Sequence, residues 1–325
     1  MIRLILSSIE KKKIALLCFL FIVLSLIWPS FTCFAKDKII IAVIYSSLAD
    51  PYKEALSGFK EQLGQQNLSI DYQQYDCNSN RQEICNRIHQ SQPDLIFVLG
   101  TEATLLAKKN IKDLPIVFSM IIDPLSHSII DSLSVPGGNI TGVSLDIPVE
   151  VQFTKLKEII PTVKRIGLMY KVGKKEKLLM QAQTAAENMG LQIVAAPIKD
   201  TPFVLTGLNE IINKIDCLWA GIDSAVYNSE TVKNVFAITI QNKIPFMAYS
   251  SKYVEAGAFL SVECDYKEIG RQSALQAMQI LNGQKPSVIP IEPPKKFITS
   301  LNKKVADLIG IPITGSVRSK IDKIF

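Results

Sequence analysis

Runs of apolar residues alternate with helical periodicities along the chain from residue 39 onward. Ile39–Ile44 is rich in β-branched residues, which is typical of a buried strand. Asp50-Pro51 predicts the start of a helix, because aspartate caps helices and proline suits the first position. Apolar side chains recur on one face of this helix until Gly64 ends it. Further strands are predicted at 69–75, 94–99 and 115–120, with helical segments near 81–90 and 103–109.

The second half of the chain repeats this order. Parallel strands joined by helices need right-handed crossovers, and their helices cover both faces of the sheet. We therefore predict an α/β fold with two doubly wound parallel-sheet lobes. Ligands bind beyond the carboxyl ends of the strands in such sheets, so two facing lobes predict a cleft. The predicted strands are 165–170, 191–196, 217–220 and 244–248, and the predicted helices are 176–189, 203–213 and 229–240.

Three segments are predicted to cross between the lobes as a hinge. The first is the turn-rich stretch 136–142, and the second is 257–264, which leads into a helix at 265–281. The third is 286–294, where four prolines favour an extended chain before a closing helix at 302–309. We predict a first lobe of residues 36–143 plus 263–290, and a second lobe of residues 144–262 plus 291–325.

The N-terminal residues predict export from the cytoplasm. Four basic residues precede an apolar run at 14–28, which is shorter than the roughly 18–20 residues of a spanning helix. Cleavage after Ala35 gives a signal peptide of residues 1–35 and a periplasmic or otherwise extracytoplasmic protein. Two alternatives stay open: the segment remains as an anchor, or Cys33 carries a lipid.

Charge and composition exclude several classes of protein. Without residues 1–35 the net charge is +3, with no clustered basic face for nucleic acid. There is no C-x-x-C pair, and His89 and His127 are the two histidines of the chain, so neither a metal site nor a cofactor is expected. The chain also lacks a glycine-rich phosphate loop and a nucleophile elbow, so we do not predict an enzyme.

Cys77 and Cys85 are candidates for a disulfide. They lie eight residues apart, and export would place them in an oxidising compartment. The bridge needs their Cα atoms within about 7 Å of each other. The alternative is that Cys85 packs on the buried face of its helix beside Ile84 and Ile88, while Cys77 is a free thiol in a loop. We favour the disulfide.

Several short motifs together resemble the ABC-transporter substrate-binding family typified by tryptophan/tyrosine-binding lipoproteins. The resemblance covers residues 38–311, and its most specific part is Pro136–Ser144, which reads PGGNITGVS. It implies the type I periplasmic-binding fold and a receptor that delivers a ligand, often an aromatic amino acid, to an ABC transporter permease. The other matching stretches are Pro93–Ile96, Gly100–Ala103, Pro115–Phe118 with Asp123-Pro124, Gly270–Gln272, Asn302 and Leu308–Gly310.

Two stretches depart from the pattern of this family. Members usually carry a Glu-Ala-Asn-Ser-like stretch that contacts ligand after the first strand of the second lobe. This chain has Lys171–Lys177 there, and Asp223-Ser224 replaces the Asp-Asn of the next cleft loop. The resemblance therefore implies a role but no particular ligand, and whether binding survives the altered loop stays open.

Seven residues that follow predicted strands are candidates for ligand contact. Thr101 opens a helix, where its hydroxyl either caps the helix or joins the amides that bind a ligand carboxylate. Asp123 and Asp223 either pair with a ligand ammonium or only shape turns. Tyr249 offers a ring wall for an apolar group. The remaining candidates are Ser46, Ser47 and Ser250, which are either ligand contacts or solvated loop residues.

These features predict a monomeric solute-binding receptor of an ABC importer, whose cleft binds a small zwitterion such as an amino acid. One alternative is a module with the same lobes that reports ligand occupancy to a membrane receptor kinase or chemoreceptor. Another is a hydrolase with an unrecognised site. A DNA-binding repressor would need a helix-turn-helix before the lobes, where the sequence has the predicted signal peptide instead.

Overall fold

The computed structural model describes residues 38–173 and 175–325. The predicted signal peptide, with its anchor and lipid alternatives, lies outside the described residues. Ile39–Phe325 form one compact unit. In the described part of the chain, no helix has the length and apolar character needed to cross a membrane.

The first sheet has five parallel strands in the order β2-β1-β3-β4-β5. The first four strands along the chain agree with the sequence prediction. β5 was not predicted as a strand, because its first residues belong to the turn-rich stretch 136–142. The strands are β1 (Ile39–Tyr45), β2 (Ile70–Asp76), β3 (Leu95–Leu99), β4 (Ile116–Ile121) and β5 (Ile140–Ser144).

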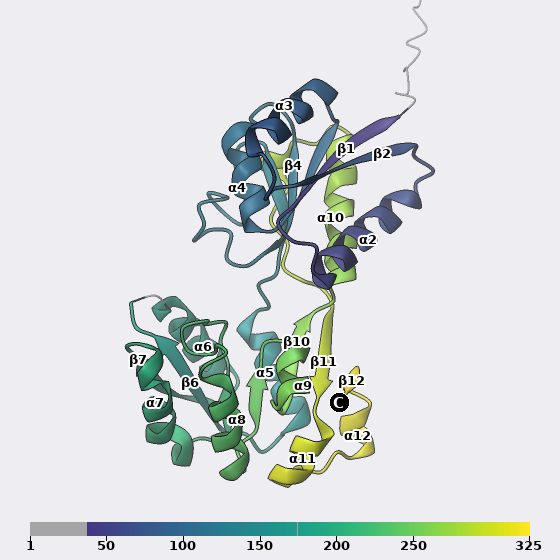
Figure 1. Ribbon diagram of the computed structural model, residues 1–325. Helices are drawn as coiled ribbons and strands as arrows, with labels where there is room; N and C mark the ends of the chain where they lie inside the picture. The colour runs from purple at the N-terminus through teal and green to yellow at the C-terminus, as the bar shows by residue number, and fades with distance from the viewer. Residues whose placement is uncertain (1–37, 174) are drawn as a thin grey trace, which may run out of the picture. The chain divides into compact units, whose positions relative to one another are not determined.

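Helices cover both faces of this sheet. Helices α2 (Asp50–Gly64) and α10 (Tyr266–Leu281) lie side by side on one face, and α3 (Arg81–Ser91) and α4 (Thr101–Asn110) cover the other (Figure 1). Alternation along β1 explains the two layers, since successive strand residues point to opposite faces. Ile41 packs with the α2 and α10 side chains, whereas its neighbour Ala42 packs with those of α3 and α4. α2 begins at Asp50, with Ala49 rather than Asp50 as its capping residue.

The second sheet has seven strands in the order β12-β11-β10-β9-β8-β6-β7. The strands from β7 to β10 are parallel, in agreement with the sequence prediction. β11 departs from that prediction, because it is antiparallel to β10. β11 and β12 were not predicted from the sequence. The strands are β6 (Arg165–Lys171), β7 (Gln192–Ile198), β8 (Cys217–Trp219), β9 (Phe246–Ala248), β10 (Leu260–Cys264), β11 (Phe297–Leu301) and β12 (Lys323–Ile324).

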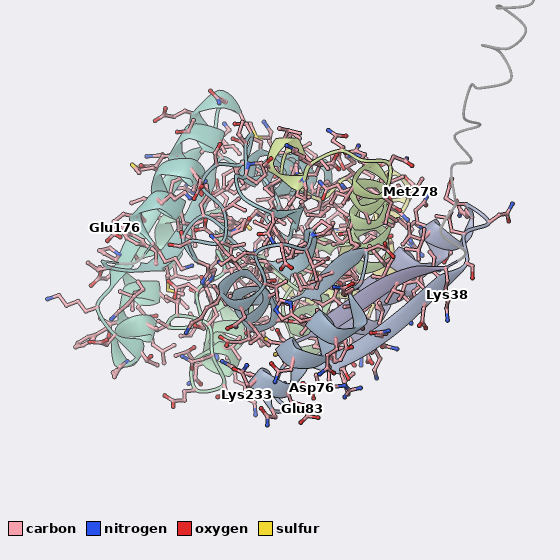
Figure 2. All side chains as sticks on the ribbon, turned by 90° about the horizontal axis from the view of Figure 1, so that it is seen from above. Lys38, Asp76, Glu83, Glu176, Lys233 and Met278 are labelled. Carbon is pink, nitrogen blue, oxygen red and sulfur yellow. The ribbon has the colours of Figure 1, made fainter. Side chains whose placement is uncertain are left out.

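Two helical layers enclose the second sheet. One contains α5 (Val149–Ile159), α6 (Glu176–Asn188) and α11 (Lys303–Ile309), and the other contains α7 (Val204–Ile211), α8 (Val232–Gln241) and α9 (Ser251–Ala256). The exposed charged side chains of Glu83, Glu176 and Lys233 project outward from their helices (Figure 2). The short remaining elements are α12 (Gly315–Arg318) and the 3-10 turns η1 (Thr201–Phe203), η2 (Ile212–Lys214) and η3 (Pro286–Val288).

The chain passes between the two sheets three times. It leaves β5 for α5, returns from β10 into α10, and leaves again after η3 to form β11. The third passage is fastened to α10, because the amide side chain of Gln272 accepts a hydrogen bond from Lys295 N and donates one to Pro293 O. The residue boundaries of the two lobes, as drawn from the sequence, stay predictions.

The disulfide predicted between Cys77 and Cys85 is wrong, since both cysteines are free in the structure. Both are buried in one apolar cluster with Ile84 and Ile88. Cys85 occupies the buried face of α3, as the alternative interpretation proposed. Cys77 differs from both interpretations: it follows β2, its amide donates to Tyr45 O at 3.0 Å, and its side chain is fully buried. Core packing therefore accounts for both thiols.

Candidate functional site

A cleft of about 960 Å³ lies beyond the carboxyl ends of strands from both sheets. Its walls come from the loop after β4, the segment joining β5 to α5, the first turns of α6, the loops after β8 and β9, and the end of β10. This is the position at which doubly wound sheets form ligand sites. Its polar and aromatic lining residues include Asp123, Ser126, Asp146, Glu150, Gln152, Lys175, Lys177, Trp219, Tyr249, Ser250, Glu263 and Tyr266.

Asp123 and Asp146 form a bonded pair at one wall of the cleft. The backbone amide of Asp123 donates to both carboxylate oxygens of Asp146, each at 3.0 Å. Asp123 adopts a left-handed φ of 48°, which aspartate tolerates better than most residues. Burial raises the pKa of Asp146, and the nearby negative charge of Asp123 raises it further against the opposing effect of the amide bond. Asp146 therefore holds the loop after β4 in place.

The Asp123 carboxylate itself is stabilised in its charged form. Partial burial acts to raise its pKa, but hydrogen bonds from Ser126 and the positive charge of Lys177 outweigh burial and lower the pKa. Lys177 Nζ lies 3.5 Å from Asp123 Oδ1. Asp123 thus has its own cationic partner, from the first turns of α6.

Aromatic rings contribute to the apolar part of the lining, beside aliphatic side chains. The buried Trp219 indole donates from Nε1 to Gln152 Oε1 at 2.9 Å, and its ring meets Phe153 edge-on at 5.1 Å. Tyr249 donates from its hydroxyl to the hydroxyl of Tyr253 at 2.6 Å. Because their polar atoms are satisfied within the protein, the faces of these rings are suited to contact an apolar ligand group.

Glu263 is a lining residue that the sequence prediction missed. It stands in the middle of the buried strand β10 and is 6% exposed. Its Oε2 accepts a hydrogen bond from Ser251 N, at the start of α9, at 3.2 Å. The signal in the sequence was a single carboxylate inside the otherwise apolar and small run Leu260–Cys264, which we predicted as a crossing.

Three of the seven predicted residues, Asp123, Tyr249 and Ser250, line the cleft. Ser46 and Thr101 do not, but the structure brings them together at the start of α4. Ser46 Oγ accepts a hydrogen bond from Ala103 N at 2.9 Å, so Ser46 caps α4. The capping position itself is Gly100, not Thr101.

Ser47 and Asp223 also lie outside the cleft lining. Ser47 Oγ accepts from Ala49 N at 3.1 Å, just before α2. Asp223 is 4% exposed, and both its oxygens are occupied: Oδ2 accepts from Lys171 N at 2.8 Å and Oδ1 from Ala225 N at 3.0 Å. Asp223 therefore ties the end of β6 to the loop after β8. The ligand contacts proposed for all seven residues stay predictions.

Among residues 38–173 and 175–325, no group of three His, Cys, Asp or Glu side chains is placed to hold a metal ion. The chemistry that the lining offers is recognition: carboxylates and lysines for charged groups, and rings for apolar ones. Two α/β sheets with a cleft at their carboxyl edges define a ligand-binding protein of the type I periplasmic-binding fold.

Comparison with protein families identifies the group within that fold. The model of the family described as "ABC transporter substrate binding protein" matches residues 38–324, nearly the whole described chain. The chain belongs to this family of ABC transporter substrate-binding proteins, which bind solutes.

Two relatives illustrate the sequence similarity. The chain is 26% identical over 229 residues to the tyrosine-binding protein of Clostridioides difficile (strain R20291), a match that spans 69% of this chain and 66% of that protein. It is also 26% identical over 285 residues to an uncharacterized protein of Rickettsia prowazekii (strain Madrid E), covering 84% and 86% of the two chains.

Solved structures show the same fold. The ligand-free, open structure of a substrate-binding protein with adhesive properties from Clostridium difficile matches with a TM-score of 0.78 and 24% identity, over 88% of this chain and 98% of that one. An ABC domain from Streptococcus pneumonia in complex with L-Trp matches with a TM-score of 0.64 and 23% identity, over 89% and 100%. These two likenesses concern the fold alone.

Proposed function

We propose that this protein is the extracytoplasmic receptor of an ABC importer and that its cleft binds an amino acid with an aromatic side chain. The observation that carries the proposal is the cleft itself, in which Trp219, Tyr249 and Tyr266 stand among carboxylates and lysines. Rings suit an aromatic side chain, and paired charges suit a zwitterion. The volume is at the upper end of the roughly 300–1,000 Å³ typical of small-molecule pockets.

The sequence relative named a tyrosine-binding protein supports this class of ligand. Family membership supports delivery to a membrane permease, and the predicted signal peptide supports an extracytoplasmic location. The receptor acts as a monomer in this proposal. Of the seven predicted residues, Asp123, Tyr249 and Ser250 are proposed as direct ligand contacts because they line the cleft.

A thermal-shift screen over the twenty amino acids tests this function, using the chain from residue 36 onward, which contains the whole compact unit. Ligand at about 100 times Kd adds roughly 2.7 kcal/mol of stability, so tyrosine or tryptophan should raise the melting temperature clearly. Trp219 is the single tryptophan in this part of the chain and lines the cleft, so its fluorescence gives a second readout. A panel without any shift would overturn the proposal.

A further inference from the structure

The Glu263 carboxylate is the most buried acid of the cleft. Successive side chains of a strand point to opposite faces of the sheet, so the side chains of Glu263 and Ser261 in β10 point to the same face. That face lies toward α9. The residue is 6% exposed, yet it contributes to the cleft lining. A carboxylate in such a position is costly to keep charged unless a cation or several hydrogen bonds compensate for lost water.

Compensation for Glu263 is incomplete in the protein. Across residues 38–173 and 175–325, its carboxylate accepts the single hydrogen bond from Ser251 N and forms no ion pair. An ionised carboxylate has about four acceptor positions, so most of its capacity is unused. Two other acids of the lining differ from Glu263: Asp123 is paired with Lys177, and both carboxylate oxygens of Asp146 accept a hydrogen bond from the Asp123 amide. A third, Glu150, is exposed to solvent.

Glu263 and Asp146 both place negative charge near Cys264, at this end of the cleft. Burial raises the pKa of the neighbouring Cys264 thiol to about 12, with further contributions from the charges of Asp146 and Glu263. Burial also raises the pKa of Tyr266, and Glu263 is the strongest of the charges that add to the effect. The rings of Tyr249 and Tyr266 line the same cleft. Negative charge beside aromatic rings is a setting that favours an organic cation.

We propose that Glu263 is a specificity-determining residue that pairs with an ammonium group of the ligand. The proposal rests on the proposed function and adds to it the chemical class that the cleft selects: molecules that carry a protonated amine beside an aromatic group. Analogues that lack the amine leave the Glu263 carboxylate buried and unpaired, so the cleft should reject them.

The competing explanation is that Glu263 only positions helix α9, since its Oε2 accepts a hydrogen bond from the backbone amide of Ser251, the first residue of that helix. Glu263→Gln separates the two roles, because glutamine keeps a carbonyl acceptor for Ser251 N but removes the charge. Glu255→Gln is the matched control: Glu255 is an exposed glutamate of α9 that does not line the cleft, and its replacement removes the same charge.

Calorimetry on wild type and both variants tests the proposal with L-tyrosine and L-tryptophan and their amine-free analogues, 3-(4-hydroxyphenyl)propionate and indole-3-propionate. Wild type and Glu255→Gln should prefer the amino acid by at least tenfold. Glu263→Gln should bind the amino acid roughly 10- to 150-fold more weakly, the range of a charge-assisted hydrogen bond, so that the preference for the amine disappears. Circular dichroism checks that each variant is folded.

The outcomes separate the two proposals. If wild type binds an amino acid but Glu263→Gln keeps both its affinity and its preference for the amine, Glu263 only positions α9 and the inference is overturned, while the receptor function stands. Equal binding of the amine-free analogue to wild type overturns it in the same way. If wild type binds neither amino acid, the proposed ligand class fails, and the role of Glu263 fails with it.

Discussion

A β-carbon added to Gly58 would lie 1.9 Å from the backbone carbonyl oxygen of Lys267, on the opposite helix. The reciprocal contact is equally close: a β-carbon on Gly270 would lie 1.9 Å from Ala55 O. Helices α2 and α10 thus touch backbone to backbone where two glycines cross. This contact fixes α10, which directly follows the chain's return from β10, against the first sheet.

Replacing either crossing glycine should destabilise the protein. We expect Gly58→Ala or Gly270→Ala to lower the free energy of unfolding by about 3 kcal/mol, at the upper end of overpacking effects, because backbone atoms must move. Gly64→Ala is the control, since nothing lies within 4 Å of its added β-carbon and it should be neutral or stabilise by up to about 1 kcal/mol. Urea denaturation measures all three. Equal stabilities for the three variants would contradict the close crossing.

Glu61 should make stability depend on pH in the acid range. Its carboxylate lies 2.7 Å from Lys267 Nζ and 2.8 Å from an Arg271 nitrogen, on the same pair of helices. Hydrogen bonds from Lys267 and then Arg271 lower its pKa from 4.5 to about 2. Because the pKa is lower in the folded state, the stabilisation is complete above pH 4.5 and is lost as the pH falls toward 2.

The measurement is the difference in unfolding free energy between wild type and Glu61→Gln as a function of pH. The difference should be largest at neutral pH, shrink below pH 4.5, and weaken in 1 M salt because the pairs are half-exposed. Glu54→Gln, at an exposed position of the same helix, serves as the control and should show no such trend. A difference that is constant from pH 7 to pH 2 would argue against the pairs.

The chain from residue 36 onward should contain four free thiols that react slowly in the folded state. Burial raises the pKa of Cys77 and of Cys85, so both the thiolate fraction and access to reagent are low. We expect a thiol reagent to modify four cysteines after unfolding without reductant, and reductant to leave the melting temperature unchanged. Labelling of only two cysteines would instead support the disulfide that was predicted from the sequence. The other two thiols are Cys217 and Cys264.

Asp223 should contribute to stability whatever its role in binding. Asp223→Ala removes the acceptor of two backbone amides, those of Lys171 and Ala225, and should lower the free energy of unfolding by roughly 1.5–3 kcal/mol. Chemical denaturation measures this loss, and unchanged stability would contradict the two bonds. Asp223→Asn tests the ligand role predicted from the sequence, which requires a loss of roughly 1.5–3 kcal/mol in binding by calorimetry. Unchanged affinity would leave Asp223 with its structural role alone.

Local patterns in the sequence were sufficient to predict the two-lobed α/β fold. β1 and β3 are runs of apolar residues buried on both faces, and apolar residues recur along one face of α2, so each element is visible in a short window of sequence. The order of these elements then restricts the topology, because parallel strands need helical crossovers. The same local reasoning placed Asp123, Tyr249 and Ser250 after strands, at the edge where the cleft forms.

The tertiary structure decided what depends on contacts between distant residues. β11 pairs antiparallel with β10 and completes the second sheet, although no periodicity in Phe297–Leu301 indicates its partner. Burial of Cys77 and Cys85 depends on the strands and helices around them, and spacing alone wrongly favoured a bridge. The role of Glu263 also depends on distant contacts. The sequence shows a charged residue at this position, but only the packing of α9 against β10 makes it a buried acid in the cleft. Burial sets the free energy of a polar group, and burial is a property of the assembled fold.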